Sequence, residues 1–291
     1  MKKLLTLLIL SITMIAVVGC GAGDDSADSE MTTLEKAQQE GKIVVGFANE
    51  KPYAYKTADG EITGEAVEVA RTVLKELGIN EMEGVVTDFG ALIPGLKAER
   101  FDIITAGMYI TPPRAKEVNF GEPEYSIGEA LAVQKGNPKD LHSYKDIAEN
   151  PDATIAIMAG AIETDYVKAV GVSEDQIEVV SDIPSCISAL QSGRVDATTM
   201  TNMTMQSAME TADSSNIEVV TDFTQPVIDG KSVKGYGAAA FRKADTDFLE
   251  AYNAELAKLK ESGELLEIIS EFGFTKDNLP GDVTTAELSQ E

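Results

Sequence analysis

The chain of 291 residues contains few of the side chains on which several classes of function depend. Its two cysteines, Cys20 and Cys186, cannot form a disulfide framework. Its single histidine, His142, excludes a metal site built from histidines and argues against a serine catalytic triad. We therefore predict no metal, no cofactor and no catalytic residue, and we expect His142 to lie in a surface loop.

Basic side chains are scarce as well, because 24 lysines and arginines oppose 49 acidic residues and give a formal charge of −25. Without residues 1–19, which carry two lysines and no acid, 22 basic residues remain and the charge is −27. Such a surface repels nucleic acid and anionic lipid headgroups. It also suits high salt, where screening weakens the self-repulsion. A saline habitat is our hypothesis, and plain acidity is the alternative.

No apolar run is long enough for a permanent membrane span. Two lysines precede an apolar stretch over residues 4–18, which is the pattern of a cleaved signal peptide. Small residues then lead to Cys20 and resemble a bacterial lipobox, although an ordinary signal peptide with an incidental cysteine is the alternative. We predict a signal peptide over 1–19, a lipid on Cys20 as the only membrane attachment, and a flexible tether over 20–40. The mature protein would lie outside the cytoplasmic membrane, in a periplasm or on the open cell surface.

Two segments of the chain repeat one pattern. Asp88 and Asp102 are fourteen positions apart, and Asp182 and Asp196 have the same spacing. In both segments a leucine precedes the second aspartate by six positions. Each segment reads as a strand, an aspartate that caps a helix, a tight turn and a second strand. The repeat puts Cys186 on the core-facing side of its helix, so we expect a buried, unreactive thiol.

Strand and helix patterns alternate along the rest of the chain. Short apolar runs and helical spacings predict strands over 43–47, 103–104, 154–158 and 177–180 and helices over 66–77 and 163–170. This alternation predicts an α/β fold in two lobes, with a largely parallel sheet in each lobe.

Two extended apolar segments, 129–133 and 236–241, bracket the second repeated unit. A chain that leaves one lobe, builds another and returns has a discontinuous first lobe and two hinge crossings. We predict a first lobe over 41–133 and 239–281, a second lobe over 134–238, and a polar tail over 282–291. Because ligands bind beyond the carboxyl ends of strands in such sheets, we expect the site in the cleft between the lobes.

Residues 89–114 are the most informative segment. They read as an amphipathic helix, a buried strand, a loop that contains Gly107, and then Arg114. An arginine fixed beyond a strand end can hold a carboxylate by two parallel hydrogen bonds. The segment therefore predicts the capture of a small anionic or zwitterionic solute.

Over residues 41–280 the chain resembles family 3 of the solute-binding proteins, the extracytoplasmic receptors of ABC importers, and segment 89–114 is the most specific part of this likeness. Within the family it is similar to the ectoine/hydroxyectoine-binding proteins over residues 46–55, 64–70, 107–114, 135–147 and 226–237. The resemblance implies a type II, Venus-flytrap fold and a monomer that closes on one solute and presents it to a membrane permease. It also implies a compatible solute as the cargo, taken up for osmoprotection, and no enzymatic activity.

The resemblance assigns roles to residues of the first lobe. Arg114 would hold the carboxylate of ectoine, and Glu50 would accept hydrogen bonds from its amidinium group, with Gly107 beside them. An aromatic cage around the delocalised cation would comprise Tyr53, Phe89 and Tyr109. Tyr55 is the alternative to Tyr53 if the first loop is read two residues further along.

In the second lobe the resemblance is less specific. The backbone N–H groups of Ala161 and Ile162 would face the carboxylate, and Glu163 would begin a helix. The remaining candidates of this lobe are Thr201 and Asn202. Receptors of the family for ordinary amino acids usually carry serine or threonine where Tyr109 stands and often an aspartate near Thr201. Their replacement argues for a ligand without a free primary amine.

Three other functions stay open. A receptor for a polar or cationic amino acid would use Arg114 for the carboxylate and Glu50 for the amine. A dehydratase of similar fold would need a general acid in the cleft, where Glu50 and Glu163 are the available carboxyls. A stand-alone lipoprotein could also pass its state to a separate sensor. Ectoine and hydroxyectoine are not ranked by the sequence.

Overall fold

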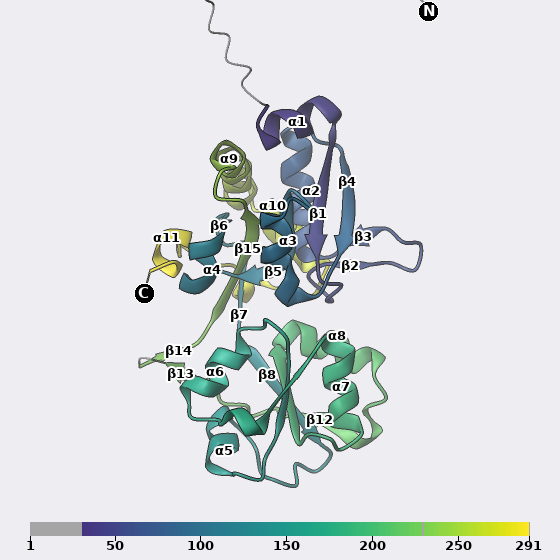
Figure 1. The fold of residues 1–291 in the computed structure, drawn as a ribbon, viewed down its shortest axis with the longest axis vertical. Coiled ribbons are helices and arrows are strands. Elements are labelled where there is room, and N and C mark those ends of the chain that lie inside the picture. The colour runs from purple at the N-terminus through teal and green to yellow at the C-terminus, as the bar shows by residue number, and fades with distance from the viewer. Residues whose placement is uncertain (1–30, 229, 291) are drawn as a thin grey trace, which may run out of the picture. The chain divides into compact units, whose positions relative to one another are not determined.

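The computed structural model describes residues 31–228 and 230–290. The predicted signal peptide and Cys20 lie outside the described residues. The chain from Thr32 onwards builds two main sheets, each with its own helices, and these are the two lobes of the fold (Figure 1). Among the described helices, none is long and apolar enough to cross a membrane.

The sheet of the first lobe has a parallel centre with antiparallel additions. Its strands are β1 Lys42–Phe47, β4 Glu81–Val86, β5 Ile103–Tyr109, β6 Asn119–Phe120, β7 Tyr125–Ile127 and β15 Gly235–Phe241. The strand order is β4-β1-β5-β15-β6, and β7 also pairs with β15. β1 runs parallel to β4 and β5, whereas β15 runs antiparallel to β5, β6 and β7.

The sheet of the second lobe has the same kind of centre. Its strands are β8 Glu129–Gln134, β9 Ile155–Met158, β10 Ile177–Val180, β11 Ala197–Thr201 and β12 Ile217–Val219. The order is β10-β9-β11-β8-β12, with β9 parallel to β10 and β11 and with β8 antiparallel to β11 and β12. Each sheet is therefore parallel over three neighbouring strands, β4-β1-β5 and β10-β9-β11, and antiparallel beyond them.

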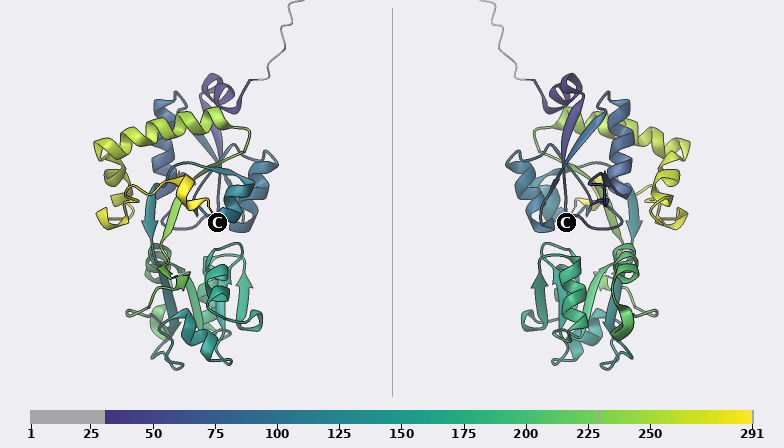
Figure 2. Two further views of the ribbon diagram at one scale, coloured as in Figure 1. Left: turned by 90° about the vertical axis from the view of Figure 1, so that its left-hand side faces the viewer. Right: turned by 90° about the vertical axis from the view of Figure 1, so that its right-hand side faces the viewer.

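Helices cover these sheets. Those of the first lobe are α1 Thr33–Glu40, α2 Glu65–Glu76, α3 Leu92–Lys97, α4 Pro112–Glu117, α9 Thr246–Ser262, α10 Glu264–Ser270 and α11 Thr285–Leu288. Those of the second lobe are α5 Tyr144–Glu149, α6 Glu163–Ala169, α7 Ile183–Gln191 and α8 Asn202–Thr211. Figure 2 shows α9 and α10 on one side of the first sheet and α3 on the other.

Short elements complete the described chain. The 3₁₀ turns are η1 Phe89–Ala91, η2 Glu174–Gln176, η3 Ser214–Asn216 and η4 Lys276–Asn278. Two small hairpins pair β2 Tyr55–Lys56 with β3 Ile62–Thr63 and β13 Val227–Ile228 with β14 Lys231–Ser232.

The second aspartate of the repeated sequence pattern has the same role in both lobes. Asp102 accepts a hydrogen bond from the backbone N–H of Val44 at 3.1 Å. Asp196 accepts one from the backbone N–H of Thr154 at 2.8 Å. Each aspartate therefore fixes the beginning of its own strand to the beginning of the neighbouring parallel strand, β1 in the first lobe and β9 in the second. The repeat is thus a repeat of structure as well as of spacing.

The first aspartate of the pattern differs between the lobes. Asp182 caps α7 by accepting a hydrogen bond from the N–H of Ser185 at 2.8 Å, as predicted. Asp88 makes no such cap, and the prediction is wrong there, because η1 rather than an α-helix begins at that point. Cys186 lies on the buried face of α7, as predicted.

The lobe boundaries differ from the prediction at both crossings. β8 belongs to the second sheet, so the first crossing falls at Gly128 and not after residue 133. β15 belongs to the first sheet from Gly235 onwards, so the second crossing ends before residue 238. Gln225 joins the two crossings, because its side chain accepts from the N–H of Glu129 at 2.9 Å and donates to its carbonyl at 2.7 Å.

The predicted tether and tail also need correction. Residues 33–40 are not flexible but form α1, which begins with a capping box between Thr32 and Glu35. Thr32 and Thr33 donate hydrogen bonds to Asp247 and Asp245 at the start of α9, which holds α1 against the first lobe. The tail contains α11, whose Leu288 packs against the core of the same lobe.

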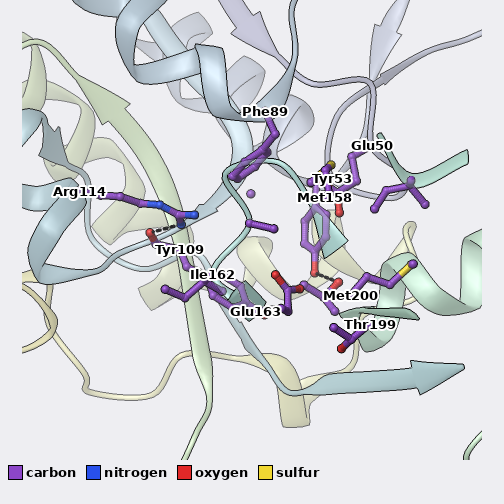
Figure 3. A pocket seen from close by; sticks show the side chains of 14 residues that line it. Glu50, Tyr53, Phe89, Tyr109, Arg114, Met158, Ile162, Glu163, Thr199 and Met200 are labelled. Carbon is purple, nitrogen blue, oxygen red and sulfur yellow. Dashed lines mark hydrogen bonds between the residues drawn. The ribbon is translucent and has the colours of Figure 1, made fainter. Parts of the chain in front are cut away.

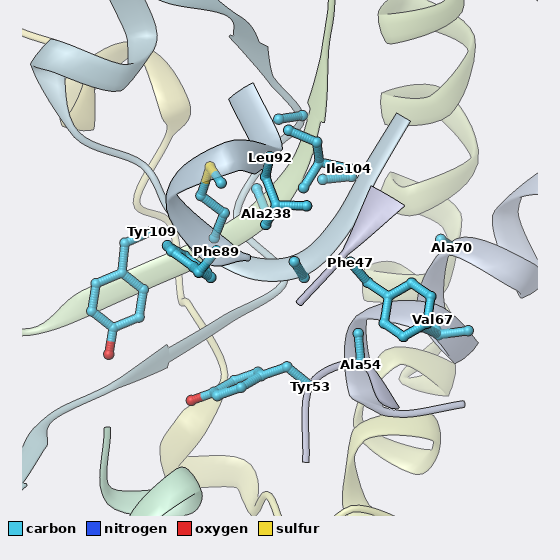
Figure 4. Close-up of a cluster of buried hydrophobic side chains, with 14 of the residues drawn as sticks. Phe47, Tyr53, Ala54, Val67, Ala70, Phe89, Leu92, Ile104, Tyr109 and Ala238 are labelled. Atoms are coloured by element: carbon cyan, nitrogen blue, oxygen red, sulfur yellow. The ribbon is translucent and has the colours of Figure 1, made fainter. Parts of the chain in front are cut away.

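The hydrophobic core of the first lobe reaches the expected site. Phe47, Leu92 and Ile104 pack in its centre and are fully buried. Figure 4 shows the rings of Tyr53 and Tyr109 in the same cluster, with both hydroxyl groups turned away from it. The aromatic wall of the site is therefore an extension of a rigid core.

Candidate functional site

A pocket lies where the two lobes meet (Figure 3). The first lobe lines it with Glu50, Tyr53, Phe89, Gly107, Tyr109 and Arg114, and the second with Met158, Ala161, Ile162, Glu163, Ile183, Thr199, Met200 and Thr201. The volume of the pocket is about 430 Å³. Because both lobes line it, separation of the lobes opens it to a solute.

Hydrogen bonds across the cleft hold the lobes together. They run from Tyr53 Oη to Thr201 Oγ1 at 2.9 Å, from Thr204 Oγ1 to Glu50 Oε1 at 2.7 Å, and from Arg114 Nη2 to the carbonyl of Gly160 at 2.9 Å. Gly160 has φ 80, and a Cβ there would meet the Cα of Gly90 in the opposite lobe at 2.6 Å. The structure is therefore a closed conformation, and closure at this point requires glycine.

Arg114 lies in the last turn of α4, beyond the end of β5. Its Nη1 donates to the carbonyl of Tyr109 at 2.9 Å, which fixes the guanidinium to its own lobe. The guanidinium carbon lies 5.4 Å from the centre of the Phe89 ring, within the range of a cation–π contact. Burial lowers the pKa of Arg114 and the nearby Glu163 raises it, so the side chain stays a cation. Its remaining N–H groups can hold a carboxylate.

Tyr53 is held rigidly beneath the pocket. Its ring lies 5.1 Å from that of Tyr125, and it is 2% exposed. Gly107 lies inside β5 rather than in a loop, with φ 61, and a Cβ there would meet the Tyr53 ring at 2.5 Å. Tyr125 in turn donates to the carbonyl of Gly107 at 2.7 Å. Only glycine allows the strand to pass so close to the ring.

Glu50 is the acidic group of the first-lobe wall. It follows β1, where its backbone forms an antiparallel bridge with Ala54. Burial raises the pKa of its carboxyl to about 7, the hydrogen bond from Thr204 lowers it, and the charge of Glu163 raises it further. A buried carboxyl with a raised pKa becomes ionised when a cation arrives, which suits it to bind an amidinium or ammonium group.

Two further acids belong to the second lobe. Glu163 opens α6 and lines the pocket, although it is only 5% exposed. Its carboxyl lies against that of Glu129 at the start of β8, and burial raises the pKa of both. Glu129 Oε1 accepts a hydrogen bond from Tyr109 Oη at 3.3 Å. Within the described ranges, no group of three or more histidine, cysteine, aspartate or glutamate residues is arranged to hold a metal ion.

The structure brings together nine of the ten residues predicted for the site. Asn202 is the exception, because it is exposed at the start of α8 and lines a separate surface groove with Met205 and Met209. Tyr55, the alternative to Tyr53, also lies away from the pocket, in β2.

The backbone donors of the second lobe are partly occupied. The N–H of Ala161 donates to the carbonyl of Met158 at 3.1 Å within the turn before α6. Ile162 is therefore the better candidate of the predicted pair for a contact with a ligand. Glu163 begins the helix as predicted, and it also lines the pocket, where the sequence had named it as one of two carboxyls within reach of the cleft.

Four lining residues besides Glu163 were missed: Met158, Ile183, Thr199 and Met200. Met158 ends β9, and Thr199 and Met200 lie near the end of β11. The rule that ligands bind at the carboxyl ends of strands could have identified these three residues. Ile183 opens α7 directly after the capping Asp182, a position that the repeated pattern also marked.

Comparison with known proteins is consistent with this geometry. Residues 43–275 match the bacterial extracellular solute-binding proteins, family 3. A probable amino-acid ABC transporter periplasmic-binding protein of Sinorhizobium fredii, y4tE, is 38% identical over 260 residues, which are 88% of this chain and 85% of the relative. The arginine-binding extracellular protein ArtP of Bacillus subtilis is 27% identical over 91% of this chain and 95% of its own. A crystal structure of EhuB in complex with hydroxyectoine is 37% identical and has a TM-score of 0.81 over 89% of this chain and 98% of that one.

The chain therefore belongs to the bacterial extracellular solute-binding proteins, family 3. Its two lobes, two hinge crossings and central pocket have the type II fold of such receptors. It is a substrate-binding protein of an ABC importer of the amino-acid type, and its family consists of receptors rather than enzymes.

Proposed function

We propose that this receptor captures ectoine or hydroxyectoine in the pocket between its lobes and delivers it to the membrane subunits of an ABC importer. Ectoine is a small ring that carries a carboxylate and a delocalised amidinium cation. A site for it needs a planar double donor, an acceptor for the amidinium N–H groups, and aromatic faces between the two.

One observation carries the proposal: Arg114 and Glu50 line the same pocket, with the rings of Tyr53, Phe89 and Tyr109 also in its wall. Arg114 would bind the carboxylate through the N–H groups that Tyr109 and Gly160 do not use. Glu50 would accept from the amidinium, and the cation would lower its raised pKa. The likeness to EhuB, which was crystallised with hydroxyectoine, supports the same class of ligand.

The second candidate ligand is a cationic amino acid such as arginine. One feature of the pocket favours it, since Glu163 adds an acid that a simple zwitterion does not need. The name of the relative ArtP points in the same direction. Against it stands Tyr109, an aromatic residue where receptors for ordinary amino acids usually carry serine or threonine, whose hydroxyl donates to Glu129 in the second lobe.

The proposal also covers the place of action. Lipid attachment at Cys20, after removal of residues 1–19, would hold the receptor outside the cytoplasmic membrane as a monomer near its permease. Without residues 1–19 the formal charge is −27, which suits salty surroundings, where uptake of a compatible solute protects the cell against osmotic stress. Processing can be checked by mass spectrometry of the mature protein, which should carry diacylglycerol on Cys20. An unmodified Cys20 would refute the anchor and leave the binding proposal intact.

Calorimetric titration tests the ligand. A soluble form that lacks residues 1–20 would be titrated with ectoine, hydroxyectoine, arginine, lysine and glutamine, at low and high salt. We expect heat from the two ectoines, weaker binding in Phe89→Ala, and none in Arg114→Ala, because that change removes the only cation among the lining residues. Binding of amino acids with silence from both ectoines would refute the proposal. Arg100→Ala, in the turn before β5, is a matched control that should bind as the wild type does.

A further inference from the structure

The second-lobe wall of the pocket carries a buried acid, Glu163, that hydrogen bonds to a second buried acid, Glu129. Glu163 is 5% exposed and is aimed at the same space as Arg114 and Tyr53 (Figure 3). Glu129, behind it, is 2% exposed, and its Oε2 has no hydrogen-bond partner among the described residues. Two buried carboxyls in contact are costly unless a donor reaches them.

The protein offers this pair little compensation. The titratable groups that interact with Glu163 come from six elements and from the loop after β1: Glu129 from β8, Arg114 from α4, Tyr109 from β5, Tyr144 from α5, Cys186 from α7, Tyr166 from its own helix α6, and Glu50 across the cleft. Arg114 is the only cation among them. It already donates to the carbonyls of Tyr109 and Gly160, and its other N–H groups are needed for the carboxylate of the ligand. Glu129 supplies one hydrogen bond to Glu163, so a further side-chain donor must come from the ligand.

Glu50 cannot accept hydrogen bonds from two separate donor groups at different ends of the ligand. It belongs to the first lobe, where its Oε1 accepts from Thr204 at 2.7 Å. Glu163 belongs to the second lobe and meets the ligand only when the cleft closes. A donor group on the ligand that reaches Glu163 would bridge the lobes and favour the closed state.

We propose that Glu163, backed by Glu129, is a second acceptor subsite that selects ligands with a hydroxyl or ammonium group in addition to the group held by Glu50. This inference rests on the proposed function, and within it the receptor prefers hydroxyectoine to ectoine. A hydrogen bond to a buried charged acceptor makes a difference of about tenfold to a hundredfold in affinity. An analogue without the donor leaves the acceptor unpaired and binds correspondingly more weakly.

The test compares two ligands in three proteins by calorimetry. The ratio of the Kd of ectoine to that of hydroxyectoine should be at least about tenfold in the wild type. In Glu163→Met, which keeps the length of the side chain and removes the acceptor, the ratio should fall to about twofold or less. Asp165→Asn removes a charge from the exposed face of the same helix and should keep the wild-type ratio.

Folding of the variant can be verified independently. Glu163→Met relieves the contact between two buried acids, so its thermal unfolding should occur at the wild-type temperature or above. Glu129→Gln gives a second measurement, because Glu163 then faces a neutral amide and should keep a preference for hydroxyectoine. A wild-type ratio near one, or a ratio that survives in Glu163→Met, overturns the inference.

The outcomes also separate this inference from the proposed function. If both ectoines bind equally well, the proposed function stands and the subsite falls. A different result would be binding of arginine and of neither ectoine. The proposed function is then refuted, and the subsite is supported if Glu163→Met weakens arginine binding by about tenfold or more. Silence with every ligand in all three proteins overturns both.

Discussion

The ionisation of Glu50 makes a quantitative prediction about pH. Burial raises the pKa of its carboxyl to about 7 in the closed protein. A cationic group of the ligand binds the ionised carboxylate and not the protonated acid. We therefore expect the affinity for ectoine or hydroxyectoine to increase as the pH rises through 7, with Glu50 as the main titrating group.

The magnitude follows from the pKa. With a pKa of about 7, roughly one tenth of the carboxyl is ionised at about pH 6 and roughly nine tenths at about pH 8, so the apparent Kd should fall about tenfold over that interval. The stability of the ligand-free protein has the opposite sign. A carboxyl whose pKa is raised on folding stabilises the protein fully below its unfolded value of 4.5, and this contribution is lost as the pH rises through about 7. The loss for Glu50 is roughly 3 kcal/mol.

Calorimetric titration of one ligand across this pH range, at constant ionic strength, measures the effect. Glu50→Gln should bind more weakly and lose most of the pH dependence. Thr204→Val removes the hydrogen bond that lowers the pKa of Glu50, so the increase in affinity should move to higher pH. Glu210→Gln, which removes an exposed acid of the same helix as Thr204, should follow the wild-type curve.

Two results would refute this reasoning. Equal affinity on both sides of pH 7 in the wild type would mean that Glu50 is ionised throughout or does not touch the ligand. A tenfold change that persists at about its full size in Glu50→Gln would assign the titration to another carboxyl, such as Glu163.

Three further predictions concern other parts of the molecule. Asp222 and Asp140 hydrogen bond to His142 at 2.7 Å and 3.0 Å and raise its pKa, so the NMR titration of this imidazole should have its midpoint above 6.5, and Asp222→Asn should lower it. The stabilisation is present below pH 6.5 and lost as the pH rises through the raised pKa; a midpoint below 6.5 would contradict the contact. Burial raises the pKa of Cys186 to about 12. In the folded protein without residues 1–20, this thiol should therefore resist a disulfide reagent that modifies the same chain unfolded in urea. Rapid reaction in the folded protein would contradict the burial of Cys186. Asp196→Ala removes the acceptor for the N–H of Thr154 and should lower the unfolding free energy by roughly 2–3 kcal/mol in urea denaturation, whereas a loss under about 0.5 kcal/mol would show that the bond contributes little.

Much of the fold could be predicted because its signals are local. The parallel centre of each lobe follows from the repeated aspartates, since Asp102 and Asp196 bind the neighbouring strand in the same way. The assignment of β8 and β15 to their sheets could not be predicted, because an extended apolar segment fits either of two sheets. The helix α1 was not predicted, although the capping box of Thr32 and Glu35 is visible in the sequence. The helix follows a polar stretch, and we assigned both to the tether.

The two walls of the site differ in how well the sequence predicted them. Arg114, Glu50 and the aromatic residues lie at the ends of first-lobe strands or within a few residues of them, where both the sheet rule and the family resemblance point. The contact between Glu163 and Glu129 was not predicted, since nothing in a chain with 49 acids marks which of them are buried together. Their contact depends on the turn before α6 meeting the first residue of β8, which only the three-dimensional structure reveals.

A crystal structure of the complex with ectoine or hydroxyectoine tests the central claim most directly. The account predicts that the carboxylate of the ligand lies about 3 Å from the guanidinium of Arg114, with the ring N–H groups on Glu50 and the ring against Tyr53, Phe89 or Tyr109. In the hydroxyectoine complex, the hydroxyl should reach Glu163. A ligand bound in the reverse orientation, or one whose carboxylate avoids Arg114, would contradict the account.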